Sequence, residues 1–141
     1  MTTTKKSKYG LRALVYMACN PQKKFSVKEI SEKEDISKRY LEQIFLILKK
    51  SGLIISSKGA YGGYILSKSP KEISVADILG VLEDTQGFPC CNNYNLETLE
   101  SVLEKEVWEK MDEKIKELTR NISLQDLKDK YNDGRTDIYY I

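Results

Sequence analysis

Apolar residues in the first third of the chain recur every three or four positions, the spacing that places side chains on one face of an α-helix. This pattern predicts a first helix over about residues 7–19, which Asn20-Pro21 ends. A short helix follows Ser26, and a third runs from Ser37 to Ser51-Gly52, with a tight turn at residues 34–36 between them. Two short helices joined by a few residues form a helix-turn-helix. The inward positions of the first helix are Leu11, Leu14, Val15 and Ala18.

Serine residues stand at four of the predicted helix starts. Ser26, Ser74 and Ser123 are each followed three residues later by an acidic residue, and Ser37 precedes the third helix. A serine hydroxyl at this position accepts a hydrogen bond from an N–H group of the first turn, and a nearby acid favours the helix start. The four serines therefore support the helices that the periodicity predicts.

The period changes after the third helix. Residues 53–56 and 64–67 are short, apolar and rich in β-branched residues, and they predict two strands. The segment that joins them, Lys58-Gly-Ala-Tyr-Gly-Gly-Tyr64, holds three of the eight glycines of the chain. A hairpin directly after a helix-turn-helix is a wing. A further helix follows Ser74, with its inward positions at Val75, Ile78, Leu79 and Leu82.

A long helix is predicted over residues 96–120, followed by a short helix over 124–131. The long helix carries one continuous apolar stripe on an otherwise charged surface. That stripe is longer than a small domain can cover, so we expect it to form a dimer interface. The expected dimerisation residues are Leu96, Leu99, Leu103, Val107, Trp108, Met111, Ile115 and Leu118.

These elements predict a mainly α fold with a small β-hairpin. A winged helix-turn-helix domain covers residues 1–84, and a turn-rich loop covers 85–95. The long dimerisation helix and a short terminal helix cover residues 96–131, and a tail follows over 132–141. No run approaches the roughly 18 apolar residues of a membrane-spanning helix, and the first residues lack the apolar stretch of a signal peptide. We therefore expect a cytoplasmic protein without membrane contact.

The charge of the chain is divided between its two halves. Residues 1–82 carry 15 Lys/Arg and 7 Asp/Glu, whereas residues 83–141 carry 8 and 14, so their net charges are +8 and −6. A basic first half favours a polyanionic partner such as DNA, which an acidic second half avoids.

The content of histidine and cysteine argues against an enzyme. The chain has no histidine, which excludes the Ser-His-Asp and Cys-His nucleophile arrangements and the commonest zinc ligand. Its cysteines are Cys19, Cys90 and Cys91, and none has Cys-x-x-Cys spacing. We expect no catalytic residue and no metal site. A redox enzyme built on Cys90 and Cys91, and a helical adaptor that binds only protein, are the competing classes.

The third helix presents polar side chains opposite its apolar face. On a helical wheel Arg39, Gln43 and Lys50 lie opposite the apolar stripe, and Glu42 lies on the flank. Arg and Gln match guanine and adenine edges in the major groove, and Glu accepts from cytosine. Leu46 also falls near this face. It either meets a thymine methyl group or indicates that the helix is rotated relative to the wheel.

The hairpin tip supplies features that suit phosphate. Glycines allow a close backbone approach, and Lys58 adds a positive charge. We expect Tyr61, at the tip, to contact nucleic acid, and Tyr64 to pack within the hairpin.

At these residues the sequence is similar to the Rrf-two family of bacterial winged-helix regulators. This family includes iron–sulfur cluster regulators, nitric-oxide-sensing repressors and cysteine-metabolism repressors. The matching stretches are "SKYGLRALVYMA", "ISKRYLEQIFLILKKSGLI", "SKGAYGGYILSKSPKEISVADILGVLE" and the long C-terminal helix. The resemblance implies a homodimer on a pseudo-palindromic operator, with the long helices crossing and the recognition helices in successive major grooves. The expected DNA-binding residues are Lys28, Ser37, Lys38, Arg39, Tyr40, Glu42, Gln43, Lys50, Lys58, Ala60, Tyr61, Gly62 and Gly63.

The signal that the protein senses is left open by the sequence. Cluster-binding relatives carry three spaced cysteines before the long helix, whereas this chain has only Cys90-Cys91 there. We expect no cofactor. The alternatives are an iron–sulfur cluster shared between two subunits, oxidation of the cysteine pair or its bridging between subunits, and two unreactive thiols.

The resemblance is greatest to the cysteine-metabolism repressors, which implies control of cysteine or sulfur metabolism. The chain ends in "TDIYYI", and an apolar side chain beside a terminal carboxylate suits a pocket that supplies backbone donors. The resemblance implies that Tyr140 and Ile141 bind cysteine synthase. The alternatives are a tail that folds back on the dimer and a tail that frays.

Overall fold

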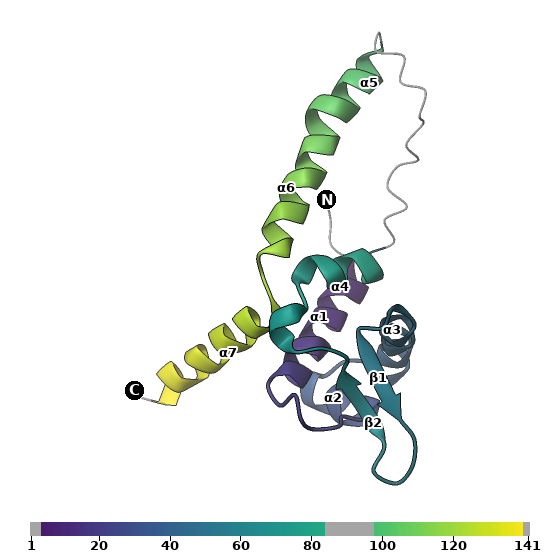
Figure 1. Cartoon of the computed structure of the whole chain (residues 1–141), viewed down its shortest axis with the longest axis vertical. Helices are drawn as coiled ribbons and strands as arrows, with labels where there is room; N and C mark the ends of the chain where they lie inside the picture. Colours follow the sequence, from purple (N-terminus) through teal and green to yellow (C-terminus); the bar gives the residue numbers. More distant parts are fainter. Residues whose placement is uncertain (1–3, 84–97, 140–141) are drawn as a thin grey trace.

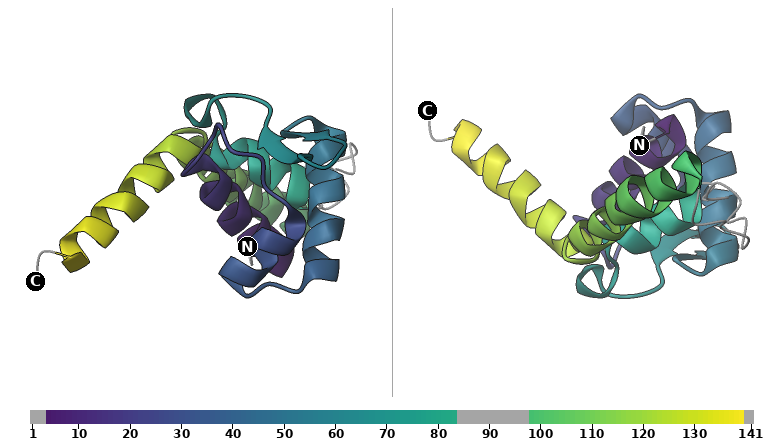
Figure 2. Two further views of the ribbon diagram at one scale, coloured as in Figure 1. Left: turned by 90° about the horizontal axis from the view of Figure 1, so that it is seen from below. Right: turned by 90° about the horizontal axis from the view of Figure 1, so that it is seen from above.

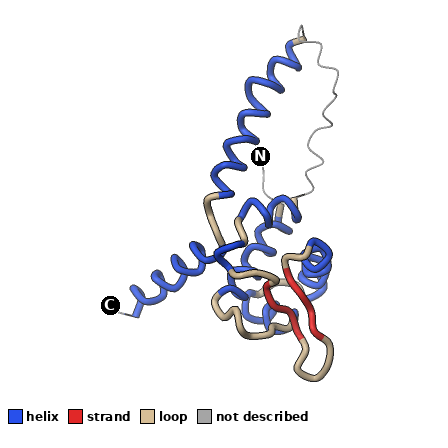
Figure 3. Tube along the Cα trace, viewed as in Figure 1, coloured by secondary structure: helices blue, strands red, loops and turns tan. Residues whose placement is uncertain are grey.

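The computed structural model describes the backbone of residues 4–83 and 98–139 and the side chains of residues 4–83 and 98–134. The chain forms helices with one two-stranded antiparallel hairpin, which confirms the predicted fold class (Figures 1 and 3). The first part contains α1 (Lys5–Ala18), α2 (Val27–Glu34), α3 (Lys38–Ser51), β1 (Ile54–Ser57), β2 (Gly63–Leu66), the short helix η1 (Pro70–Glu72) and α4 (Val75–Leu82). The second part contains α5 (Leu99–Leu103), the π turn η2 (Glu104–Trp108), α6 (Glu109–Arg120) and α7 (Leu124–Tyr139).

The four predicted serine caps are present. Ser26, Ser37, Ser74 and Ser123 each accept a hydrogen bond from the N–H group three residues later. At Ser74 and Ser123 the acidic side chain of Asp77 or Asp126 also accepts from the N–H of the serine, which closes a capping box.

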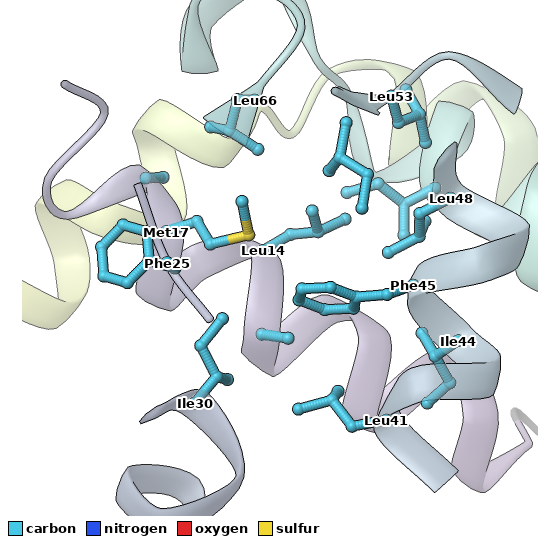
Figure 4. Close-up of a cluster of buried hydrophobic side chains, with 14 of the residues drawn as sticks. Leu14, Met17, Phe25, Ile30, Leu41, Ile44, Phe45, Leu48, Leu53 and Leu66 are labelled. Carbon is cyan, nitrogen blue, oxygen red and sulfur yellow. The ribbon is translucent and has the colours of Figure 1, made fainter. Parts of the chain in front are cut away.

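The core lies where α1 and α3 meet the hairpin and α4. Its largest buried side chains include Phe45, Leu14 and Met17, each with an exposed fraction of at most 1% (Figure 4). Phe45 meets Tyr64 edge to face with ring centroids 5.0 Å apart, so α3 is packed directly onto the hairpin. Full burial of one such apolar side chain contributes about 1.5–3 kcal/mol, and this contribution holds α3 in place.

The hairpin pairs Ile54 with Leu66 and Ser57 with Gly63. Both strands are therefore displaced by one residue from the predicted ranges 53–56 and 64–67. Phe25, which precedes α2, adds a bridge to Tyr64 on the other edge of β2, with N···O distances of 2.9 and 2.7 Å. This bridge fixes the start of α2 beside the end of β2 that adjoins the hairpin turn.

The second half of the chain extends away from this domain. The α5–α6 helix projects from it, and α7 leaves on the side opposite α3 (Figures 1 and 2). The junction between α6 and α7 is tied to the domain by two backbone hydrogen bonds, from Val75 N–H to Ile122 O (2.8 Å) and from Leu124 N–H to Ile73 O (2.9 Å). Ser74 and Ser123, the caps of α4 and α7, thus form an isolated antiparallel bridge.

Two predicted boundaries in this half were wrong. The long helix begins at Leu99 after the cap Thr98, while Leu96 lies outside the described residues. The last helix does not end at Tyr131 but continues to Tyr139 through most of the predicted tail. A single glycine, Gly134, costs a helix only about 1 kcal/mol relative to alanine, and no proline is present to end it. None of the described helices is both long enough and apolar enough to cross a bilayer.

Candidate nucleic-acid interface and dimerisation surface

The turn between α2 and α3 depends on one residue in the left-handed region. Asp35 has φ 52° and ψ 50°, and it is the one non-glycine residue with positive φ among those the structure describes. Aspartate tolerates this conformation better than most residues do. Ile36 follows it, is 5% exposed, and donates its N–H to Ser31 O at 3.0 Å. The left-handed conformation of Asp35 and the burial of Ile36 together set the direction in which α3 begins.

Arg12 of α1 fixes the end of α2. Its guanidinium donates to the backbone oxygen of Glu34 at 2.6 Å and to the Glu34 carboxylate at 3.1 Å. Both side chains are partly exposed, at 47% and 27%, so the ion pair contributes at most about 1 kcal/mol. Its main effect is to position the last turn of α2, which leads directly into the turn at Asp35 and Ile36 before α3.

The rotation of α3 about its axis is fixed by four buried side chains. Leu41, Ile44, Phe45 and Leu48 are all at most 1% exposed. The opposite face is a row of exposed side chains at spacings of four, three and four residues, which we call the outward row. The outward row consists of Arg39, Gln43, Leu46 and Lys50. The predicted orientation of Arg39, Gln43 and Lys50 is therefore confirmed, while their contact with DNA stays a prediction.

The other predicted residues of the helix-turn-helix have mixed environments. Lys28 on α2 is exposed, as are Lys38 and Glu42 on α3. Ser37 caps α3, with its hydroxyl 3.4 Å from the N–H of Tyr40. Tyr40 is partly buried, and its ring meets Tyr9 edge to face at 5.8 Å, so it has a packing role besides any contact with a ligand.

The hairpin tip is an exposed turn. Lys58 and Ala60 are exposed, Tyr61 is 91% exposed, and Gly62 donates its N–H to Gly59 O at 3.0 Å. The tip forms the lower end of the domain in Figure 1, at the far end of the two strands. Gly63, which begins β2, is partly buried. The tip thus exposes a lysine ammonium group, a tyrosine hydroxyl group and the backbone around Gly59 and Ala60 to solvent.

Two glycines of the tip are required by the turn itself. Gly59 has φ 113°, a conformation that side-chain-bearing residues rarely adopt. A Cβ atom on Gly62 would lie 2.3 Å from the backbone oxygen of Ser57. The sequence interpretation attributed these glycines to close phosphate approach, whereas the folded turn needs them without any ligand. The edge-to-face contact of Tyr64 with Phe45 shows that Tyr64 has a packing role, although its partner lies on α3 and not within the hairpin.

The cations of this surface are not neutralised by ion pairs within the described residues. The ion pairs there involve Arg12, Lys23, Lys110 and Lys114. The hydrogen bond to Glu29 raises the pKa of Lys23, so that lysine remains charged but is engaged on the side of α2. The remaining cations leave a positive surface along α3 and the tip. They include Lys38, Arg39, Lys49 and Lys50 on α3 and Lys58 at the tip, with Lys28 on α2 nearby in the sequence.

The long helix shows a second surface. Trp108 is 50% exposed, and the neighbouring positions of the stripe are exposed or half-buried. Contiguous apolar side chains on a projecting helix mark an interaction surface. The exposed fractions are 76% for Leu99, 43% for Leu103, 42% for Met111 and 63% for Leu118, and Val107 and Ile115 are partly buried.

Sequence reasoning missed a groove between α1 and α7. The groove has a volume of about 560 Å³ and is mostly apolar. Leu11 and Val15, predicted to face the core, are only partly buried and line this groove with Leu127 and Tyr131. The four-residue spacing of Leu127 and Tyr131 was the available signal, since it places both on one face of α7.

Several predicted residues lie outside the described residues. They are Leu96, Cys90, Cys91, Tyr140 and Ile141. Cys19 is described; it follows the last turn of α1, is partly buried, and donates its N–H to Val15 O at 3.1 Å. Within the described parts of the chain, no three Cys, His, Asp or Glu side chains gather in a way that would hold a metal ion.

Comparison with protein families places most of the chain in one profile. Residues 3–130 match the Rrf2 (Rrf-two) family, described as "Iron-dependent Transcriptional regulator". The HTH-type transcriptional regulator CymR of Bacillus subtilis is 34% identical over 140 residues, which cover 99% of this chain and 97% of that protein. The HTH-type transcriptional regulator IscR of Pectobacterium carotovorum is 31% identical over 129 residues, covering 90% of this chain and 79% of that protein.

Solved structures give the same likeness. The structure of T. potens IscR superposes with a TM-score of 0.77 at 33% identity, covering 95% of this chain and 90% of that one. The structure of CymR (YrzC), the global cysteine regulator of B. subtilis, superposes with a TM-score of 0.74 at 30% identity, covering 92% and 97%. The fold and the sequence thus point to one group of proteins.

Proposed function

We propose, because the chain belongs to the Rrf2 family of transcriptional regulators, that it is a repressor that binds its operator through the outward row of α3 and the hairpin tip. The observation that carries this proposal is the outward row itself. Arg39, Gln43 and Lys50 are exposed on the face opposite a fully buried one, and the hairpin of the same domain bears Lys58 at its exposed tip. A helix with such a face fits the major groove.

The two parts of the surface have different tasks in this proposal. Arg39 and Gln43 have the geometry to bond guanine and adenine edges, and Glu42 accepts from cytosine. Lys58, the open backbone of the tip and Tyr61 contact phosphates, which position the protein but do not specify sequence. Lys28 and Lys38 add positive charge on the flanks.

We further propose that the protein acts as a homodimer formed by the long helix. The exposed apolar stripe supports this, since Leu99 and Leu118 are 76% and 63% exposed in the single chain. Two chains related by a two-fold axis present two copies of α3, so the operator should be pseudo-palindromic.

For the pathway, we propose control of cysteine or sulfur metabolism. The support is the likeness to CymR of B. subtilis, which is described as a global cysteine regulator. In this scheme Tyr140 and Ile141 bind cysteine synthase. Deletion of these two residues should abolish co-purification with that enzyme, and unchanged co-purification would contradict the partnership.

An iron–sulfur sensor is the alternative that the IscR relatives and the family description favour. The residues of one chain do not fit the cluster site of those relatives, because the segment before the long helix has only the adjacent Cys90 and Cys91 in place of three spaced cysteines, and the chain has no histidine. A cluster would therefore need ligands from two chains or a ligand of another type. The visible absorption spectrum of protein purified without oxygen distinguishes this sensor from the metabolic repressor.

The DNA-binding proposal predicts two different responses to the loss of one charge. Arg39→Ala should reduce the preference for particular base pairs by about 1–3 kcal/mol, whereas Lys58→Ala should weaken all sequences alike and lower the salt slope of binding by about one. Fluorescence anisotropy with labelled duplexes, at several salt concentrations, measures both quantities.

The control for this experiment is Lys116→Ala, which removes an exposed lysine of α6 far along the chain. It should leave affinity and salt slope unchanged. Equal behaviour of all three variants would contradict the assignment of the surface to α3 and the tip.

A further inference from the structure

Leu46 is an exposed apolar side chain in the middle of a polar surface. It lies on α3 between Gln43 and Lys50 in the outward row, and it is 54% exposed. Its neighbours in the row are all polar, so Leu46 is the one apolar side chain of the outward row, and its own domain covers less than half of it.

The exposure of Leu46 does not result from a rotated helix. Phe45 and Leu48, on either side of it in the sequence, are 0% exposed, so the rotation of α3 is fixed. The next residue, Ile47, is partly buried and packs against the core. Leu46 and Ile47 therefore point in different directions around the helix, and Leu46 is the one that faces solvent.

The chemistry of the major groove limits what Leu46 can contact favourably. Among the four bases only thymine presents a methyl group there, at C5, whereas the other base edges present mainly donors and acceptors. A leucine placed against those polar edges removes water without replacing the hydrogen bonds, which is unfavourable. Against a thymine methyl the same leucine buries apolar surface on both sides.

We propose that Leu46 is a specificity-determining residue that selects thymine through contact with its methyl group. This inference rests on the proposed function, because it assigns one base to the same DNA-binding face. Gln43 and Leu46 are three residues apart, about 4.5 Å along the helix axis at 1.5 Å per residue. Base pairs follow one another at about 3.4 Å. The selected thymine therefore lies one or two base steps from the base pair that Gln43 reads.

The experiment removes the methyl group and the leucine separately and together. Operator duplexes are first selected from random sequence with the wild-type protein, and each thymine of a half-site is then replaced by deoxyuridine. One deoxyuridine should weaken wild-type binding about fourfold, the value of one buried methyl group. Leu46→Ala should bind the thymine duplex more weakly but should show no further loss with that deoxyuridine. Leu46→Met, which keeps an apolar side chain, should retain most of the methyl effect.

Gln43→Ala is the matched control, since it lies next to Leu46 in the outward row. It should relax preference at its own base pair but keep the fourfold deoxyuridine effect. A scan in which no deoxyuridine weakens the wild type, or a methyl effect that survives in Leu46→Ala, would overturn the inference. Failure of the wild-type protein to select any duplex would instead contradict the proposed function.

Discussion

Helix α3 and the long α5–α6 helix have the same amphipathic pattern, but the apolar face is buried in α3 and exposed in the long helix. Leu48 on α3 is 0% exposed, whereas Leu118 on α6 is 63% exposed. In α3 the apolar face is covered by the same chain, which leaves the polar face to meet a ligand. In the long helix it is the apolar face that remains uncovered. The pattern of a helix therefore identifies its interacting face, but the surroundings decide whether the partner is internal.

Length accounts for much of this difference. From Leu99 to Arg120 the helix has 22 residues, about 33 Å at 1.5 Å per residue. The helix projects from the domain over most of that length (Figure 1). A small domain offers no surface long enough to cover such a stripe.

The largest effect is expected where the apolar face is internal. Phe45→Ala should lower the free energy of unfolding by about 3–5 kcal/mol, because it leaves a cavity beside Tyr64. Denaturant unfolding followed by circular dichroism measures this loss. Leu46→Ala, one residue along, should change stability by less than about 0.5 kcal/mol, since its side chain faces outward. Similar losses in both variants would show that the rotation of α3 is misassigned.

A smaller and concentration-dependent effect is expected on the long helix. Trp108→Ala should weaken dimerisation by about 2 kcal/mol, roughly 30-fold, since buried tryptophans often dominate interfaces. Sedimentation equilibrium over a range of protein concentrations measures the dissociation constant. Glu109→Ala, at the neighbouring exposed position, should leave dimerisation nearly unchanged. An unaltered constant for the Trp108 variant would remove the stripe from the interface.

The smallest effect on stability is expected at Glu83, the residue that follows the last turn of α4. Burial alone would raise the pKa of the Glu83 carboxyl group, but hydrogen bonds from Ser7 and Thr4 outweigh it and lower that pKa below 4.5. A lowered pKa stabilises the folded protein above about pH 4.5, and this stabilisation is lost as the pH falls further.

Glu83→Gln should therefore reduce stability at pH 7 by less than about 1 kcal/mol, because solvent screens these exposed hydrogen bonds, and by progressively less in acid. Thermal melts of both proteins between neutral and acidic pH check this convergence. Glu72→Gln, on the exposed surface of η1, serves as the control. A difference between Glu83→Gln and wild type that stays constant with pH would contradict the role of the carboxylate.

Local chemistry made much of the domain predictable. The caps Ser26, Ser37, Ser74 and Ser123 act through their own hydroxyl groups on N–H groups three residues away, so the sequence alone locates them. The buried face of α3 follows from its period of 3.6 residues. The same reasoning gave the exposed row that carries Arg39 and Gln43, the basis of the candidate site.

Features that depend on distant contacts were not predictable in the same way. The partial exposure of Leu11 and Val15 depends on where α7 packs. The π turn at Glu104–Trp108 does have a signal in the sequence. The apolar residues from Leu99 to Ile115 follow four successive spacings of four residues, which would carry the stripe about 160° around an ideal α-helix. A π turn takes up an extra residue and reduces that drift.

The paired backbone bonds between the start of α4 and the start of α7 have a consequence for the geometry of the operator. In the proposed dimer these bonds hold the long helix in a fixed position on the winged domain. The distance and the relative rotation between the two copies of α3 are therefore set by the protein. One base pair inserted at the centre of the palindrome would turn the far half-site by about 35° and move it by about 3.4 Å. The protein would thus bind operators with one spacing between the half-sites and reject operators with a longer one.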